Sequence, residues 1–148
     1  MDHYSGYCYA RLMRGTSAEE ILWEKEVYER LKDTYGDRVF AYREDNGRLP
    51  DPLFKEEVQT CGQQIKYCGV RSHHQNEIVE RIIKELTLGS WNLLLHATIL
   101  WPEELSTMMC TFSSKATLNR YNSMKMDGDG KTPEQKFSGV KFQIWPTD

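Results

Sequence analysis

Strand-like runs alternate with helical patterns along this chain, and this alternation limits the folds that it can adopt. Residues 4–13, 38–44 and 65–70 favour strands because aromatic and β-branched residues gather there between turn signals. Apolar residues at helical spacing predict helices at 17–35, 52–61, 76–98 and 101–121, with a short helical turn at 133–139. Strands interleaved with helices predict an α/β layer architecture.

Local signals fix several ends of these elements. Ser17-Ala18-Glu19-Glu20 predicts a capping box, in which the serine hydroxyl and a glutamate satisfy each other's backbone donors. Tyr35-Gly36-Asp37 predicts the end of that helix. Asp45-Asn46-Gly47 predicts a turn directly after the second strand.

Composition narrows the class of protein. A chain of 148 residues fits one domain, and 39% hydrophobic with 28% charged residues is typical of a soluble globular protein. No apolar run reaches the length of a membrane span, and the N-terminus lacks the pattern of a signal peptide. A net charge of −3 argues against a protein that coats nucleic acid through general basicity, but it allows a local basic strip.

Two carboxylates raise the question of a metal site. Asp45 follows a predicted strand, and Glu80 lies 35 positions later, in the first turns of the longest predicted helix. Each has an ordinary interpretation, since Asp-Asn-Gly is a good turn and Glu80 could pair with Lys84 on the helix surface. A β-α-β-loop unit of this length could also bring both carboxylates together, where hard oxygen ligands suit Mg²⁺ or Mn²⁺.

The segments around these residues resemble a known family. EDNGRLPDPLFKEE and YCGVRSHHQNEIVERIIKEL are similar to the catalytic core of retroviral-type integrases, most of all those of copia-type LTR retrotransposons. Asp45 matches that family's second catalytic aspartate, and Glu80 matches its catalytic glutamate. MDHYSGYCYARLMRGTSAEE, NLLLHATILWPEE and GKTPEQKFSG resemble further parts of the core, so the resemblance covers about residues 1–139.

The resemblance implies an RNase H-like mixed sheet flanked by helices, and polynucleotidyl transfer on DNA with Mg²⁺ or Mn²⁺. It implies that Asp45 and Glu80 hold the metal and are catalytic. DNA contacts are implied for Lys84, His74, Gln75, Asn76 and Asn46, although an ion pair, loop polarity and helix capping explain most of these residue types equally well. The resemblance is compatible with a homo-oligomer. It implies neither a membrane partner nor a small-molecule cofactor. An active integrase is expected in the nucleus, and we expect this chain to be intracellular and not secreted.

The sequence also departs from the family. Its first catalytic aspartate has no match, because Asp2 falls in the element that resembles the second strand. We therefore expect an N-terminally truncated core over residues 1–121, lacking its first strand, with a loop and C-terminal segment at 122–148. Glu77 stands where the family has glycine, which adds charge near Glu80. Whether the chain is an enzyme stays open: we expect weak or no integration activity, and the alternative is a non-catalytic remnant with residual nucleic-acid binding.

Three smaller features complete the predictions. The spacing of Cys61, Cys68, His73 and His74 matches no usual zinc pattern, so all four cysteines are interpreted as reduced and mostly buried thiols. The Asp127–Gly130 segment predicts a turn instead of a calcium loop. One apolar group is expected to form core or a subunit interface, with base stacking as an alternative: Trp91, Leu93, Leu94, Leu95 and Trp101.

Overall fold

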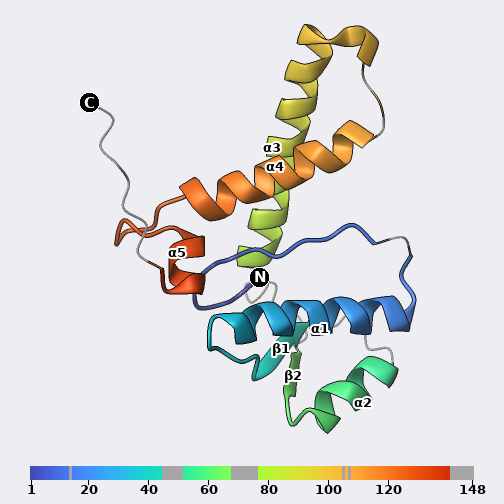
Figure 1. Ribbon diagram of the computed structural model, residues 1–148, viewed down its shortest axis with the longest axis vertical. Coiled ribbons are helices and arrows are strands. Elements are labelled where there is room, and N and C mark those ends of the chain that lie inside the picture. Colours follow the sequence, from blue (N-terminus) through green and yellow to red (C-terminus); the bar gives the residue numbers. More distant parts are fainter. Residues whose placement is uncertain (14, 45–51, 68–76, 105, 107, 141–148) are drawn as a thin grey trace. The chain divides into compact units, whose positions relative to one another are not determined.

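Two compact units make up this chain (Figure 1). The computed structural model describes residues 1–13, 15–44, 52–67, 77–104, 106 and 108–140. Arg11–Arg81 form one unit, called the sheet unit below. Met1–Ala10 and Ile82–Asp148 form the other, called the helical unit. The expected division at residue 121 stays a prediction.

The sheet unit opens with α1, Ala18–Thr34. Ser17 is the N-cap, and its hydroxyl accepts a hydrogen bond from the Glu20 N–H, which confirms the serine half of the predicted capping box. The Glu20 carboxylate accepts a hydrogen bond from the Gly15 N–H at 2.9 Å, so it anchors the chain that leads into the helix. Gly36 ends the helix with a φ of 75°, a conformation that glycine adopts without strain.

Two parallel strands form the sheet of the described residues. β1, Ala41–Glu44, pairs with β2, Gln64–Tyr67, so that Ala41 lies opposite Gln64 and Glu44 opposite Tyr67. α2, Pro52–Thr60, lies in the connection, as a parallel pair requires a crossover. Its Val58 is fully buried. β1 is shorter than the strand predicted at 38–44. β2 agrees with the strand predicted at 65–70 as far as residue 67, and residues 68–70 lie outside the described residues.

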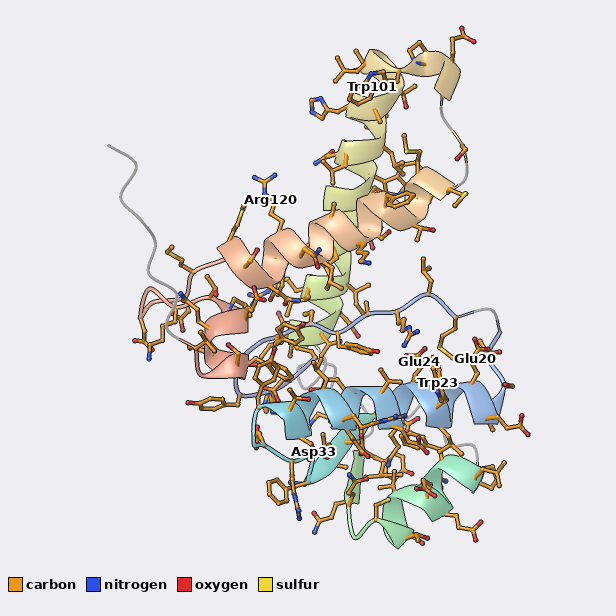
Figure 2. All side chains as sticks on the ribbon, in the orientation of Figure 1. Glu20, Trp23, Glu24, Asp33, Trp101 and Arg120 are labelled. Carbon is orange, nitrogen blue, oxygen red and sulfur yellow. The ribbon has the colours of Figure 1, made fainter. Side chains whose placement is uncertain are left out.

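A polar network joins α1 to the sheet. Glu29 accepts hydrogen bonds from the Tyr42 hydroxyl at 2.5 Å, from Gln63 Nε2 at 2.6 Å and from Lys25 Nζ at 3.1 Å. Burial alone would raise the pKa of Glu29, but these three hydrogen bonds outweigh it and lower that pKa. At the start of α1, Trp23 and Glu24 (Figure 2) both contact Arg11, whose guanidinium lies 4.6 Å from the Trp23 ring.

The helical unit contains most of α3, Glu77–Leu100, and all of α4, Met108–Met124. The two helices cross (Figure 1), and Gly89 marks the close approach because a Cβ there would lie 2.6 Å from Thr117 Cγ2. The single helix predicted at 101–121 is wrong in its first turns. A 3₁₀ turn at Pro102–Glu104 precedes α4, since proline disfavours helical backbone in the residue before it and ends α3 there.

The N-terminal segment does not form the strand predicted at residues 4–13. Its Cys8 instead forms two hydrogen bonds with the side-chain amide of Asn122 on α4. Asn122 Oδ1 accepts from the Cys8 N–H at 2.9 Å, and Asn122 Nδ2 donates to the Cys8 carbonyl at 2.8 Å. Tyr7 stacks on Phe137 with ring centroids 4.2 Å apart. The aromatic composition that favoured a strand therefore serves to dock the segment on helices.

The core of the helical unit gathers around that docked segment. Cys8, Ile82 and Tyr121 are buried together, with Leu86 and Leu118 packed against them. α5, Pro133–Ser138, follows with a complete capping box between Thr132 and Gln135. The Asp127–Gly130 segment forms the predicted turn, in which Asp127 Oδ1 accepts from the N–H groups of Asp129 and Lys131.

The described residues thus form a mixed α/β structure with a small parallel sheet and flanking helices, as the alternation predicted. An RNase H-like sheet that lacks its first strand stays a prediction. In the part of the chain that the structure describes, no helix combines the length and apolar character that crossing a membrane requires.

Candidate functional site

The carboxyl ends of β1 and β2 meet at one edge of the sheet. Glu44 ends β1 and is paired with Tyr67, which ends the described part of β2. Sites in parallel α/β sheets gather outside this edge, because the loops that follow neighbouring strands converge there. Asp45 is the next residue in the sequence after Glu44.

Glu44 is a candidate site residue that the sequence analysis did not name. One of its carboxylate oxygens is buried and has no hydrogen-bond partner among the described residues. Burial raises the pKa of Glu44, and attraction to Lys55 only partly opposes this. An uncompensated carboxylate oxygen is costly in a folded protein and is suited to a cation or a proton. Its position directly before Asp45, at the end of a predicted strand, was the signal that could have identified it.

Glu80 lies in the first turn of α3, three residues after Glu77. Both side chains are exposed. The N-terminal end of a helix favours negative charge, so this turn stabilises both carboxylates. Residues three apart are neighbours on a helix surface, and Glu77 therefore adds a second negative charge beside Glu80.

Lys84 lies one turn after Glu80 on the same helix and is exposed. The ion pairs at this spacing within the described residues are Lys25–Glu29 and Glu26–Arg30, and Glu80–Lys84 is not one of them. The solvated ion pair, which was the ordinary interpretation of these two residues, is therefore not formed. The side chain of Lys84 is directed to solvent, where it can meet an anionic ligand.

Five predicted site residues lie outside the described residues: Asp45, Asn46, His74, Gln75 and Asn76. The structure therefore tests neither their positions nor their distances from Glu80. It does describe β1, which precedes Asp45 and Asn46 in the sequence. It also describes the start of α3, which follows His74, Gln75 and Asn76. The site composed of Asp45 and Glu80 stays a prediction.

The described residues partly suit a divalent cation. Carboxylate oxygens are the donors that Mg²⁺ and Mn²⁺ prefer, and the unpartnered oxygen of Glu44 and the exposed carboxylate of Glu80 are such donors. Nowhere in the described ranges do three Asp, Glu, His or Cys side chains converge as a metal centre would require. A metal site at this edge would therefore need Asp45 as well.

Two further predictions are corrected. The cysteines are free thiols where described, but only Cys8 is buried, while Cys61 and Cys110 are exposed. The core alternative for the apolar group at the end of α3 is wrong for Trp91, which is 60% exposed, and for Trp101 (Figure 2), which is 54% exposed. Helical spacing alone does not show which apolar face of a helix is buried. Here the face of α3 that packs toward α4 is not the one that carries Trp91. A subunit interface remains a prediction for these residues.

Comparison with solved structures finds the same fold in two retroviral proteins. The catalytic core domain of BIV integrase matches with a TM-score of 0.57 over 90% of this chain and 78% of that chain, at 16% identity. The catalytic core domain of HTLV-2 integrase, in its dimeric form and in complex with magnesium, matches with a TM-score of 0.51 over 84% of this chain and 70% of that chain, at 18% identity. No protein-family model and no curated protein matches the sequence.

These comparisons place the chain in a structural class. Its fold is similar to that of retroviral integrase catalytic core domains, over most of its length. At this level of identity the similarity concerns the fold, and the chemistry has to be argued from the residues.

Proposed function

We propose that this chain acts in DNA integration, as the catalytic core of a copia-type retrotransposon integrase with an RNase H-like fold. The observation that carries the proposal is the position of Glu80. It lies exposed in the first turn of the long helix α3, after the parallel pair β1–β2, in a fold similar to two integrase cores. The resemblance of the surrounding segments to copia-type integrases supports it independently.

In this proposal Asp45 and Glu80 hold Mg²⁺ or Mn²⁺ at the carboxyl edge of the sheet. The bound metal would supply Lewis-acid stabilisation of the oxygens that attack and leave phosphorus. Glu44 lies at the same edge, and its half-buried carboxylate would add negative potential there. Of the family's three catalytic carboxylates, this sequence offers matches for two.

DNA would approach along the start of α3. Lys84 gives this exposed surface a cation for phosphate, and phosphate contacts supply most sequence-independent affinity for DNA. Asn46, His74, Gln75 and Asn76 are proposed to contact the DNA end from the two loops that flank the described elements. In this proposal the protein acts in the nucleus. The proposal also includes assembly of this chain into a homo-oligomer.

A strand-transfer assay tests the activity. The chain is incubated with a labelled DNA end and target DNA in Mn²⁺, next to Asp45→Asn, Glu80→Gln and Glu19→Gln. Glu19 is a matched control, because it is also an exposed glutamate in the first turn of a helix. The proposal expects a low yield of joined product, since one catalytic carboxylate has no match, and it expects both site variants to abolish this product and the control to retain it. Product that survives Glu80→Gln would contradict the assignment.

A second function is favoured by the charge beside Glu80. Glu77 occupies the same exposed turn, and its carboxylate repels the phosphate that a catalytic site must admit. The alternative is therefore a non-catalytic retrotransposon remnant that retains nucleic-acid binding. It predicts DNA binding that Lys84→Met weakens, without product in the strand-transfer assay.

A further inference from the structure

α4 has one packed side and one exposed side. On the packed side, Tyr121 and Asn122 contact Cys8, and Thr117 lies against Gly89 of α3. The exposed side carries five residues whose spacings of three and four make them neighbours on the helix surface. They are called the α4 face below: Phe112, Lys115, Ala116, Asn119 and Arg120.

The charges of the α4 face are both positive. They belong to Lys115 and Arg120, and no Asp or Glu occurs anywhere in residues 105–126. Neither cation forms an ion pair with another described residue, whereas Lys125, just beyond the helix, pairs with Glu85. Arg120 (Figure 2) projects away from α4 and is exposed. This local charge is opposite to the net charge of −3 of the whole chain, so the face attracts an anionic ligand.

An aromatic ring on the same face selects the kind of anion. Phe112 is 61% exposed, and Ala116, one turn further along, is too short to cover its ring. Every nucleic-acid base has a π face that stacks on such a ring, and aromatic side chains beside cations are how proteins bind single strands without sequence preference. In a duplex these base faces are already stacked on one another. The combination of ring and cations therefore favours a single strand.

Asn119 and the length of the face agree with this ligand. The Asn119 side chain is exposed and forms no hydrogen bond with another described residue, so its amide can donate to a base edge and accept from it. Phe112 and Arg120 are eight residues apart, which is about 12 Å along the helix axis. Lys115 lies between them in the sequence, so a few nucleotides could contact the ring and both cations.

We propose that the α4 face binds single-stranded nucleic acid, with a base stacked on Phe112 and phosphates beside Lys115 and Arg120. The inference goes beyond the proposed DNA chemistry at Asp45 and Glu80 and does not depend on it. The α4 face lies wholly in the helical unit and shares no residue with that site.

Fluorescence anisotropy on the full chain tests the role of the ring. The probes are labelled single strands of about 16 thymidylates or uridylates, and a duplex of equal length. Binding of either single strand, tighter than that of the duplex, is expected, and the tighter of the two identifies DNA or RNA as the ligand. Phe112→Leu should weaken binding about tenfold, because leucine stays apolar but cannot stack, whereas Phe112→Trp should retain it. Phe40→Leu is the control, since Phe40 is 76% exposed and lies in the other unit.

The dependence on salt tests the role of the cations. The Lys115→Met, Arg120→Met double variant should lower the slope of log affinity against log salt by about 1.4, because each phosphate contact with a single strand contributes about 0.7. The Arg38→Met, Lys66→Met double variant is the control, since it removes the same charge from two exposed cations of the sheet unit. A wild-type chain that binds no single strand would overturn the proposal. So would a duplex bound as tightly, wild-type affinity in Phe112→Leu, or an equal change of slope in both double variants.

Discussion

The side-chain amide of Asn122 on α4 pairs with both backbone groups of Cys8, as a neighbouring strand would. Asn122 Oδ1 accepts from the Cys8 N–H at 2.9 Å, and Nδ2 donates to the Cys8 carbonyl at 2.8 Å. All of these groups are buried, so neither backbone group can turn to water instead. One residue of α4 thereby holds the N-terminal segment in the core of the helical unit.

Replacing Asn122 with alanine should release that segment. Asn122→Ala leaves two buried backbone groups unsatisfied, and we expect a loss of about 2–4 kcal/mol in the free energy of unfolding. Urea unfolding followed by circular dichroism measures it, with Asn119→Ala as the control because Asn119 is exposed on the same helix. Equal stability of the two variants would show that the pair contributes nothing.

The close approach of α3 and α4 gives a second prediction. Gly89→Ala should destabilise the protein by about 1–3 kcal/mol despite alanine's better helix propensity, because its Cβ meets Thr117 Cγ2. Thr117→Ala removes that methyl group together with a buried hydroxyl that has no hydrogen-bond partner among the described residues. The double variant should therefore regain most of the loss. Additive effects in the double-mutant cycle would contradict the contact.

The hydrogen bond from the Tyr42 hydroxyl to the Glu29 carboxylate gives a third prediction. Tyr42→Phe removes a donor at 2.5 Å from a partly buried carboxylate, so the pKa of Glu29 should rise. The free energy of unfolding at pH 7 should fall by about 1–2 kcal/mol, less than for a fully buried charged pair. Carbon-detected NMR titration measures the pKa, and Tyr67→Phe, on the exposed end of β2, serves as the control. An unchanged Glu29 titration would refute the network's role.

The turn at Asp127 gives a prediction on pH. The ion pair with Lys136, and the N–H groups of Lys131 and Asp129, lower the pKa of Asp127 from 3.8 to about 2. A carboxyl group whose pKa is lower in the folded state stabilises the protein above its unfolded pKa, and this contribution is lost as the pH falls from about 4 to about 2. Lys136→Met should raise the pKa toward its ordinary value. Lys131→Met should not, because Lys131 donates through its backbone.

Much of the fold follows from local chemistry that the sequence displays. The Ser17 cap, the glycine after Tyr35 and the α/β order were predicted because each depends on residues adjacent in the chain. The N-terminal strand was predicted wrongly because its real partner, Asn122, is 114 residues from Cys8. No period or propensity of residues 4–13 indicates a side-chain partner at that distance.

The candidate site also contains some residues that the sequence indicates and others that only the packing reveals. Glu80 could be named as a candidate from the sequence because the motif and the spacing agree there, and its predicted place at the start of a helix is confirmed. Glu44 was overlooked although it directly precedes Asp45 at the end of a predicted strand, because its unpartnered buried oxygen is a property of packing that the sequence does not display. The exposure of Trp91 was also beyond the sequence, since an apolar helix face looks the same whether a core or a second copy covers it.

The measurement that tests the central claim most directly is calorimetric titration of Mn²⁺ and Mg²⁺ into this chain, into the Asp45→Asn, Glu80→Gln double variant and into Glu19→Gln. The proposed site predicts saturable binding by the wild-type chain and by Glu19→Gln, and its loss in the double variant. Binding of equal strength in all three proteins, or in none of them, would contradict a metal site formed by Asp45 and Glu80.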